Sequence, residues 1–433
     1  MPKIEIFFYI TIPLLILGIP LHYSVFPLCL AMLFLRCVTS ERTTVAAFLM
    51  LYAGPTIGCI RSIYPFLPVY GLVFSCLGFL MGIREFSNFF SKNRSGIIAL
   101  LLVFVYFYLA MLYGGGDAYS KDKLSNILTN GVISMLGFYI LFTSPRLRNG
   151  QFAQLLIITS VMMIEYIVSY YHIKAGGILD FNWMREATTS IEQTQLEHMI
   201  INYQHIGMNT AFALGIYMAR KELLTRKALY FCILGIWLSL MSGARQSVLA
   251  VVAIIAVRYL FFGNNGEAKF KVKYVVLIGL FLFVLYKLSY FLSIEAITKT
   301  FEEGDTGRNM LKLQALSIFE SNPYFGQGLG GFMRITGEDY PHNFFLEILC
   351  ECGLVGLIYF SFVCFIYLLK NKIGLRQQTG NKSFFIIMMI ALAVRCMVSG
   401  DFTISIQLFS ALFTLSSLSH NKNQKISNER ISI

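Results

Sequence analysis

Charged side chains are scarce in this sequence. Asp, Glu, Lys and Arg make up 13% of its 433 residues, whereas soluble globular chains carry about 25%. No polar stretch is long enough to form a large soluble domain. The shortage of charge therefore excludes an ordinary soluble enzyme.

Signals of several other protein classes are also missing. The first residues, MPKIEIFFYITIPLLILG, contain no small-residue cleavage site, so we interpret them as a membrane helix and not as a signal peptide. The nine cysteines lie in or beside apolar segments, and Cys350 and Cys352 lack the spacing of a metal site. We expect no structural disulfide, no metal ion and no cofactor.

Apolar runs of about twenty residues, long enough to cross a bilayer, recur along the whole chain. They predict an all-α integral membrane protein, a polytopic bundle of about 12 to 14 transmembrane helices that forms a single domain over residues 1–433. The predicted spans are 4–19, 22–37, 44–60, 66–83, 96–114, 126–143, 153–171, 201–219, 228–241, 247–262, 274–294, 343–369, 384–399 and 403–419.

The net charge of +12 comes from loops of alternating character. Every second loop is basic, and such loops face the cytoplasm in membrane proteins. The basic segments are 36–42, 84–94, 146–148, 220–227, 269–273, 370–382 and the tail 420–433. This pattern predicts that both termini are cytoplasmic. Orientation in the lipid bilayer therefore accounts for the positive net charge. Nucleic acid is not an expected partner.

The alternate loops should face outward, and two of them are long, at residues 172–200 and 295–342. Long irregular segments in a compact protein are usually functional. The second loop ends at His342, which we therefore expect at the outer surface of the membrane, where the chain enters its next helix.

Several arginines are expected on the outer side, among them Arg61, for which the case is weaker. Arg308 opens a predicted helix over Asn309–Glu320, and Arg245 lies in the tight connection SGARQS. Arg395 lies near the outer end of a span, close to Asp401. Two of them have a structural alternative, because Arg245 can reach the lipid headgroups and Arg395 can form an ion pair with Asp401.

Arginine binds phosphate in a fork geometry and keeps its charge at any pH, and a histidine can accept a proton from a hydroxyl. Arg245, Arg308 and His342 would therefore suit transfer from a lipid diphosphate donor to an alcohol, without a metal ion. Glu347 and Glu351 follow His342 along one helix. They either orient the histidine or line a wet cavity.

Three segments carry a resemblance to a known family. In HNFFLEILCECGLVG, His342, Asn343, Gly353 and Gly356 fit a pattern of His, then Asn, Ser or Gln, nine residues, Gly, two residues, and Gly, Thr or Tyr. With SGARQSVLA and GRNMLKLQALSIFESNPYFGQGLGGF, this segment resembles the O-antigen ligase and O-antigen polymerase superfamily of bacterial envelope glycosyltransferases. The resemblance covers about 228–370; the first two hundred residues match only in helix pattern and loop placement.

The resemblance implies a GT-C-like membrane fold in the bacterial inner membrane with a periplasmic active site. It implies a glycan donor linked to undecaprenyl diphosphate, His342 as catalytic base, and Arg245 and Arg308 as diphosphate-binding residues. Asn343 is a candidate supporting residue within the motif. Glu347 and Arg395 have no motif match and are candidate supporting residues because of their positions alone. A chain-length regulator or a flippase is an expected kind of protein partner.

The family contains polymerases, which transfer the glycan to the next lipid-linked repeat unit, and ligases, which transfer it to lipid A-core. We favour a polymerase, because each glycan type needs its own polymerase and a varied N-terminal half suits that need. A ligase is the alternative. A flippase or other transporter fits less well, because the polar residues gather at the outer surface and no inverted repeat is visible.

The alternating basic loops predict a testable topology. In a background without the nine native cysteines, single cysteines near 180 and near 320 should react with a membrane-impermeant reagent added outside intact spheroplasts. Arg376→Cys should react only after the membrane is opened. Labelling of position 376 from outside would contradict the predicted orientation.

Overall fold

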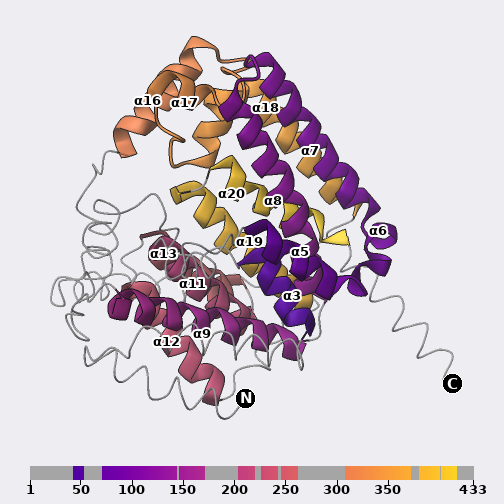
Figure 1. The fold of residues 1–433 in the computed structure, drawn as a ribbon, viewed down its shortest axis with the longest axis vertical. Coiled ribbons are helices and arrows are strands. Elements are labelled where there is room, and N and C mark those ends of the chain that lie inside the picture. The colour runs from indigo at the N-terminus through magenta and orange to yellow at the C-terminus, as the bar shows by residue number, and fades with distance from the viewer. Residues whose placement is uncertain are drawn as a thin grey trace. The chain divides into compact units, whose positions relative to one another are not determined.

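A computed structural model describes residues 42–52, 71–143, 146–170, 203–219, 226–241, 245–261, 308–371, 380–399 and 401–416. Every regular element within these ranges is a helix (Figure 1). The predicted spans 4–19, 22–37 and 274–294, the loop 172–200 and the tail 420–433 lie outside the described residues.

The chain divides into two compact units. The first consists of Met1–Gly82 and Ser144–Glu303, and the second of Ile83–Thr143 and Gly304–Ile433. The first contains α3 (Arg42–Leu51), α5 (Gly71–Gly82), α9 (Arg146–Tyr170), α11 (Tyr203–Ala219), α12 (Arg226–Met241) and α13 (Arg245–Phe261). The second contains η1 (Glu85–Asn88), α6 (Phe89–Lys92), α7 (Arg94–Tyr113), α8 (Ala118–Thr143), α16 (Arg308–Ser321), α17 (Gly331–Thr336), α18 (Phe344–Lys370), α19 (Gly380–Ser399) and α20 (Phe402–Phe413).

Among the described helices, α7, α8 and α18 are long and apolar enough to cross a membrane. The 20 residues of α7 would extend about 30 Å, which is the thickness of the hydrocarbon core. One side of α7 exposes large apolar side chains, a surface that suits lipid: Ile98, Leu101, Leu102, Val105, Tyr108, Leu109 and Leu112. These features confirm the prediction of a helical membrane protein.

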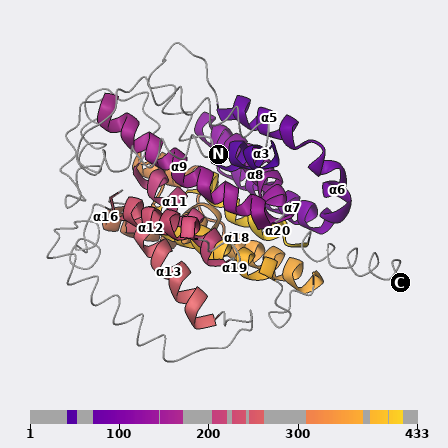
Figure 2. The same cartoon turned by 90° about the horizontal axis from the view of Figure 1, so that it is seen from below.

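In the first unit, α9, α11 and α12 pack side by side (Figure 2). The buried hydroxyls of Thr210 on α11 and Ser239 on α12 share a hydrogen bond of 2.7 Å. Tyr217 of α11 donates to the carbonyl of Gly150 on α9 over 3.4 Å. Small polar groups therefore join these largely apolar helices, as is common in membrane bundles.

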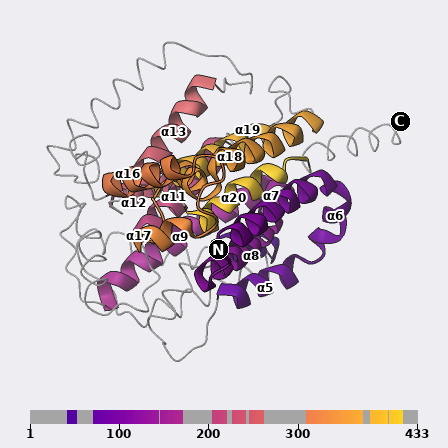
Figure 3. The ribbon, with the colours of Figure 1, turned by 90° about the horizontal axis from the view of Figure 1, so that it is seen from above.

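In the second unit, α8 packs against α7 and α20, and α18 packs against α7 and α16 (Figure 3). Ser410 of α20 donates to the carbonyl of Gly131 on α8 over 2.9 Å. Phe107 of α7 contacts the rings of Phe402 and Phe360, with centroids 4.8 and 5.0 Å away. These aromatic contacts form a core that includes the first turn of α20 and the middle of α18.

The backbone of α18 is broken at Gly353, where φ is 66° and ψ is −170°. An Asn-Pro turn after α16 fills the break. The amides of Leu354 and Val355 donate to the carbonyls of Pro323 and Tyr324 over 2.9 and 3.0 Å. In the other direction, the amide of Gln327 donates to the carbonyl of Cys350 over 2.9 Å. The predicted continuous span over 343–369 is therefore wrong at this point, because α18 is interrupted at Gly353.

The start of α8 also differs from the prediction, which placed a span at 126–143. The helix begins at Ala118 because Asp117 caps it, and the Asp117 carboxylate accepts from the Ser120 amide over 2.6 Å. The charged residues between 117 and 123 are typical of an exposed loop. In the structure, those after Asp117 belong to the first turns of α8, where Lys123 is only 4% exposed.

Replacement of Gly353 by Ala should destabilise the second unit strongly. A Cβ at this position would overlap the backbone carbonyl of Tyr324, and the backbone angles are nearly restricted to glycine. We expect a loss of at least about 3 kcal/mol, from strain and overpacking together. Thermal unfolding of the purified protein in detergent measures this loss.

Gly337 provides a matched control, because its φ is also positive, at 78°, but nothing lies within 4 Å of an added Cβ. Gly337→Ala should cost only about 1–2 kcal/mol, from the backbone conformation alone. Equal shifts in melting temperature for the two variants would show that close packing of the Asn-Pro turn against Gly353 does not contribute to stability.

Candidate active site

The structure places the predicted site residues in both units. Arg245 is the first residue of α13 in the first unit, and Arg308 is the first residue of α16 in the second. His342, Asn343 and Glu347 also belong to the second unit, where they lie at and just before the start of α18. The helix predicted at 309–320 is α16, and the expected end at Asn322-Pro323 is confirmed.

His342 is the only residue other than glycine with a positive φ among the described residues, and its φ is 53°. This left-handed conformation is strained for a histidine. His342 as a whole is partly exposed, and its ring packs edge-on against Tyr340, with ring centroids 4.5 Å apart. Strained residues persist only where their surroundings hold them, and they gather at functional sites.

Asn343 fixes the chain directly after His342. Its side-chain oxygen accepts from the amides of Phe345 and Leu346 over 3.0 and 3.1 Å, so Asn343 is the N-cap of α18. Its side-chain nitrogen donates to the carbonyl of Met397, on α19, over 3.0 Å. Asn343 therefore starts α18 and also ties this start to the end of a second helix.

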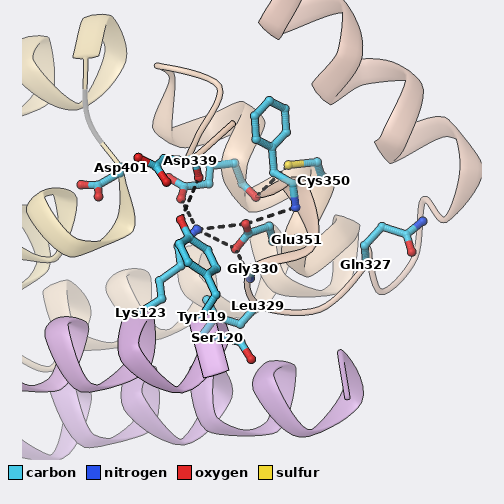
Figure 4. Close-up of polar contacts among 12 residues, drawn as sticks. Tyr119, Ser120, Lys123, Gln327, Leu329, Gly330, Asp339, Cys350, Glu351 and Asp401 are labelled. Atoms are coloured by element: carbon cyan, nitrogen blue, oxygen red, sulfur yellow. Dashed lines mark hydrogen bonds and ion pairs between the residues drawn. The ribbon is translucent and has the colours of Figure 1, made fainter. Parts of the chain in front are cut away.

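A buried ion cluster lies one to two turns further along α18. The ammonium of Lys123, on α8, lies 2.7 Å from the Glu347 carboxylate and 2.9 Å from the Glu351 carboxylate. Figure 4 shows Lys123 directed toward Glu351. Glu347 and Glu351 are fully buried. The sequence suggested that these glutamates orient His342 or line a wet cavity. The structure instead pairs both of them with Lys123.

Glu351 also binds the glycine-rich loop. Its carboxylate accepts from the amide of Gly330 over 3.0 Å and from the amide of Phe332 over 3.4 Å (Figure 4). These amides belong to the beginning of α17. The loop approaches a second helix as well, since the Leu329 amide donates to the carbonyl of Ala110 over 3.1 Å. The bare backbone of the loop thus serves close packing against α18 and α7.

A partly exposed ion pair fixes the same loop to the start of α8. The Arg334 guanidinium lies 2.7 Å from the Asp117 carboxylate and donates to the carbonyls of Leu329 and Gln327. Partial burial alone would raise the pKa of Asp117, but hydrogen bonds from Ser120 and from Arg334 outweigh it and lower this pKa. Asp117 is therefore ionised at neutral pH and holds both the start of α8 and the loop.

Arg395 donates to the side-chain oxygen of Gln407 over 3.3 Å. Asp401, the partner suggested by the sequence, is the N-cap of α20 and accepts from the amide of Ile404 over 2.9 Å. Arg395 thus lies between α19 and α20 and is only partly exposed.

Lys123 is the site residue that the sequence analysis missed. It lies between the predicted spans 96–114 and 126–143, in a segment rich in charged residues. The available signal was the capping pattern of Asp117 and Ser120, which starts a helix early enough to bury Lys123 six residues later.

The fold and the site together define a helical membrane protein with a histidine at a capped and strained helix entrance. Residues 230–361 match the model of the family described as O-antigen ligase. No curated protein and no solved structure was found to match the chain.

The family match includes Arg245, Arg308, His342 and both motif glycines, Gly353 and Gly356. It confirms the resemblance suggested by the three sequence motifs. It supports a glycosyltransferase function of the O-antigen ligase or polymerase type. Lys123 and Arg395 lie outside the matched residues.

The cap predicts graded effects of substitutions at Asn343. Asn343→Ala removes both the capping oxygen and the donor to Met397, so it should destabilise the protein by about 1–2 kcal/mol. Asn343→Asp keeps the capping oxygen and should lose only about half as much. Thermal unfolding in detergent compares the two, and equal losses would contradict a capping role.

Proposed function

We propose that this protein is a polymerase of O-antigen or of a related surface polysaccharide. It transfers a glycan from undecaprenyl diphosphate to the next lipid-linked repeat unit at the periplasmic face of the bacterial inner membrane. The observation that carries the proposal is the strained, partly exposed His342 at the entrance of α18, within the segment matched by the family model.

In the proposed reaction, a hydroxyl of the acceptor sugar gives its proton to the His342 imidazole while its oxygen attacks the anomeric carbon of the donor. The bond from that carbon to the diphosphate breaks, and undecaprenyl diphosphate leaves with the electron pair. A histidine suits this task because its ordinary pKa of about 6.5 leaves a basic nitrogen at neutral pH.

The leaving diphosphate carries charge that must be stabilised. We assign this task to Arg308 and Arg245, because a guanidinium binds two phosphate oxygens at once. Both residues open helices, and the first turn of a helix also favours an anion. These positive groups make a metal ion unnecessary for the proposed transfer.

The other predicted residues have supporting roles in this proposal. Asn343 holds the backbone next to His342 through the α18 cap and the contact with Met397. Glu347 lies in the first turn of α18 and is bound to Lys123. Arg395 bridges α19 and α20 through Gln407, near the Met397 carbonyl that anchors Asn343.

Reconstitution tests the choice of acceptor. Purified protein in lipid vesicles with lipid-linked repeat units, in the presence of EDTA, should form a ladder of products that grow by whole repeat units. Transfer that occurs only after lipid A-core is added would instead identify a ligase. Loss of transfer with EDTA and its recovery with Mg²⁺ or Mn²⁺ would contradict the metal-independent mechanism.

Removal of the His342 imidazole should lower turnover by about 10²-fold or more, the usual contribution of a general base. His342→Asn is the sharper variant, because asparagine tolerates the positive φ that alanine does not favour. The protein should remain in the membrane and still bind the lipid-linked donor. A purified His342→Asn protein with a normal transfer rate would end the assignment of His342 as base.

The arginines form a second arm of the same assay. Arg308→Lys and Arg245→Lys keep the positive charge but lose the planar fork, so each should reduce the transfer rate. Full activity of both variants at normal protein level would show that the diphosphate binds elsewhere.

A further inference from the structure

Lys123 connects three segments that are distant in sequence. Its ammonium contacts Glu347 in the first turn of α18 and Glu351 in the second. Glu351 in turn binds the Gly330 and Phe332 amides, where the glycine-rich loop becomes α17. One cation from α8 therefore fixes both the start of α18 and the loop beside it (Figure 4).

We propose that Lys123 is a positioning residue for His342. Through Glu347 and Glu351, it holds the entrance of α18 in register with the loop Gly326–Gly337. This inference rests on the proposed function, because it concerns the placement of the proposed base. Lys123 itself is only 4% exposed, so it acts through the two glutamates and not on the substrate.

The Lys123 ammonium is the main partner of two buried carboxylates. The Glu351 carboxylate receives two contacts from the Lys123 ammonium, at 2.9 and 3.1 Å, and two backbone amides. The Glu347 carboxylate, which is 0% exposed, has Lys123 as its ion partner at 2.7 Å. Burial of such groups is tolerated only where they are paired. Without the ammonium, the Glu347 carboxylate would be a buried charge with no counter-ion. This favours movement of the side chain toward water, which would displace the first turn of α18.

The strained backbone of His342 makes its position sensitive to that movement. A residue with φ of 53° relaxes when the structure around it loosens. Asn343 fixes the chain on one side through the α18 cap. Glu347 and Lys123 fix the following turn of the helix. A displacement of a reacting group by about 1 Å can cost up to about 10²-fold in rate.

A positioning role and a purely structural role predict different kinetics. If the cluster only stabilises the fold, its loss lowers the amount of folded protein, and each folded molecule keeps its normal kcat. If Lys123 positions His342, folded molecules lose kcat while KM for the donor changes little, because the contacts with the diphosphate are made elsewhere.

The test compares Lys123→Met with Lys121→Met, a control on the same helix whose side chain is exposed. Full-length protein in lipid nanodiscs is assayed with the lipid-linked donor, and backbone hydrogen exchange is measured over residues 326–343. Lys123→Met should lower kcat at least about 10-fold, with KM within about 3-fold. Exchange at Gly330 and Phe332 should become faster. Lys121→Met should match the wild type in both measurements.

A second variant, Glu347→Gln, keeps the shape and an oxygen for Lys123 but removes the charge, so it decides the question if Lys123→Met does not fold. It should show a smaller fall in kcat with unchanged KM. A wild-type kcat in the folded variant, or a rise in KM without a fall in kcat, overturns the positioning role. If the wild-type protein transfers nothing, the proposed function fails, and the exchange data still show whether Lys123 holds the loop.

Discussion

The second unit depends on one interaction, the burial of the Lys123 ammonium between the carboxylates of Glu347 and Glu351. Loss of one partner from a buried ion pair typically costs about 3–5 kcal/mol, because the remaining charge has neither water nor a counter-ion. The cluster therefore works as a constraint: α8, α18 and the loop before α17 must be in their places together. Apolar packing around it is less specific, since many arrangements of Phe and Leu bury similar areas.

This constraint is joined by a second one made of backbone alone. The Asn-Pro turn exchanges hydrogen bonds with the broken region of α18, and the loop after it donates to the end of α7. The two constraints meet on α18, because Glu351 lies two residues before Gly353. The entrance of α18 with His342 is thus held by side-chain charges and by main-chain hydrogen bonds from the same loop. Such rigid support is what a group needs if it must meet a substrate in one orientation.

Among the described residues, the sequence predicts the positions of most helices, because their apolar runs are long and their ends carry ordinary signals. The start of α18 at Asn343 and the end of α16 before Asn322-Pro323 follow from local capping and proline chemistry. The role of Gly353 could not be predicted, because a break in α18 depends on a turn thirty residues earlier in the chain. Lys123 was missed for a similar reason, since its partners Glu347 and Glu351 are more than two hundred residues away. The proposed roles of Arg245 and Arg308 come from local motifs and resemblance, and their side chains lie outside what the structure describes.

The break at Gly353 has a consequence for biosynthesis. It lies roughly 14 Å from the start of an apolar helix that is long enough to cross the bilayer. A lipid environment offers no water to unpaired amides, so Leu354 and Val355 need the carbonyls of Pro323 and Tyr324. These partners are synthesised first and precede α18 in the chain. The broken helix therefore has its full set of hydrogen bonds only once the preceding turn has docked against it, which couples the folding of α18 to the docking of that turn.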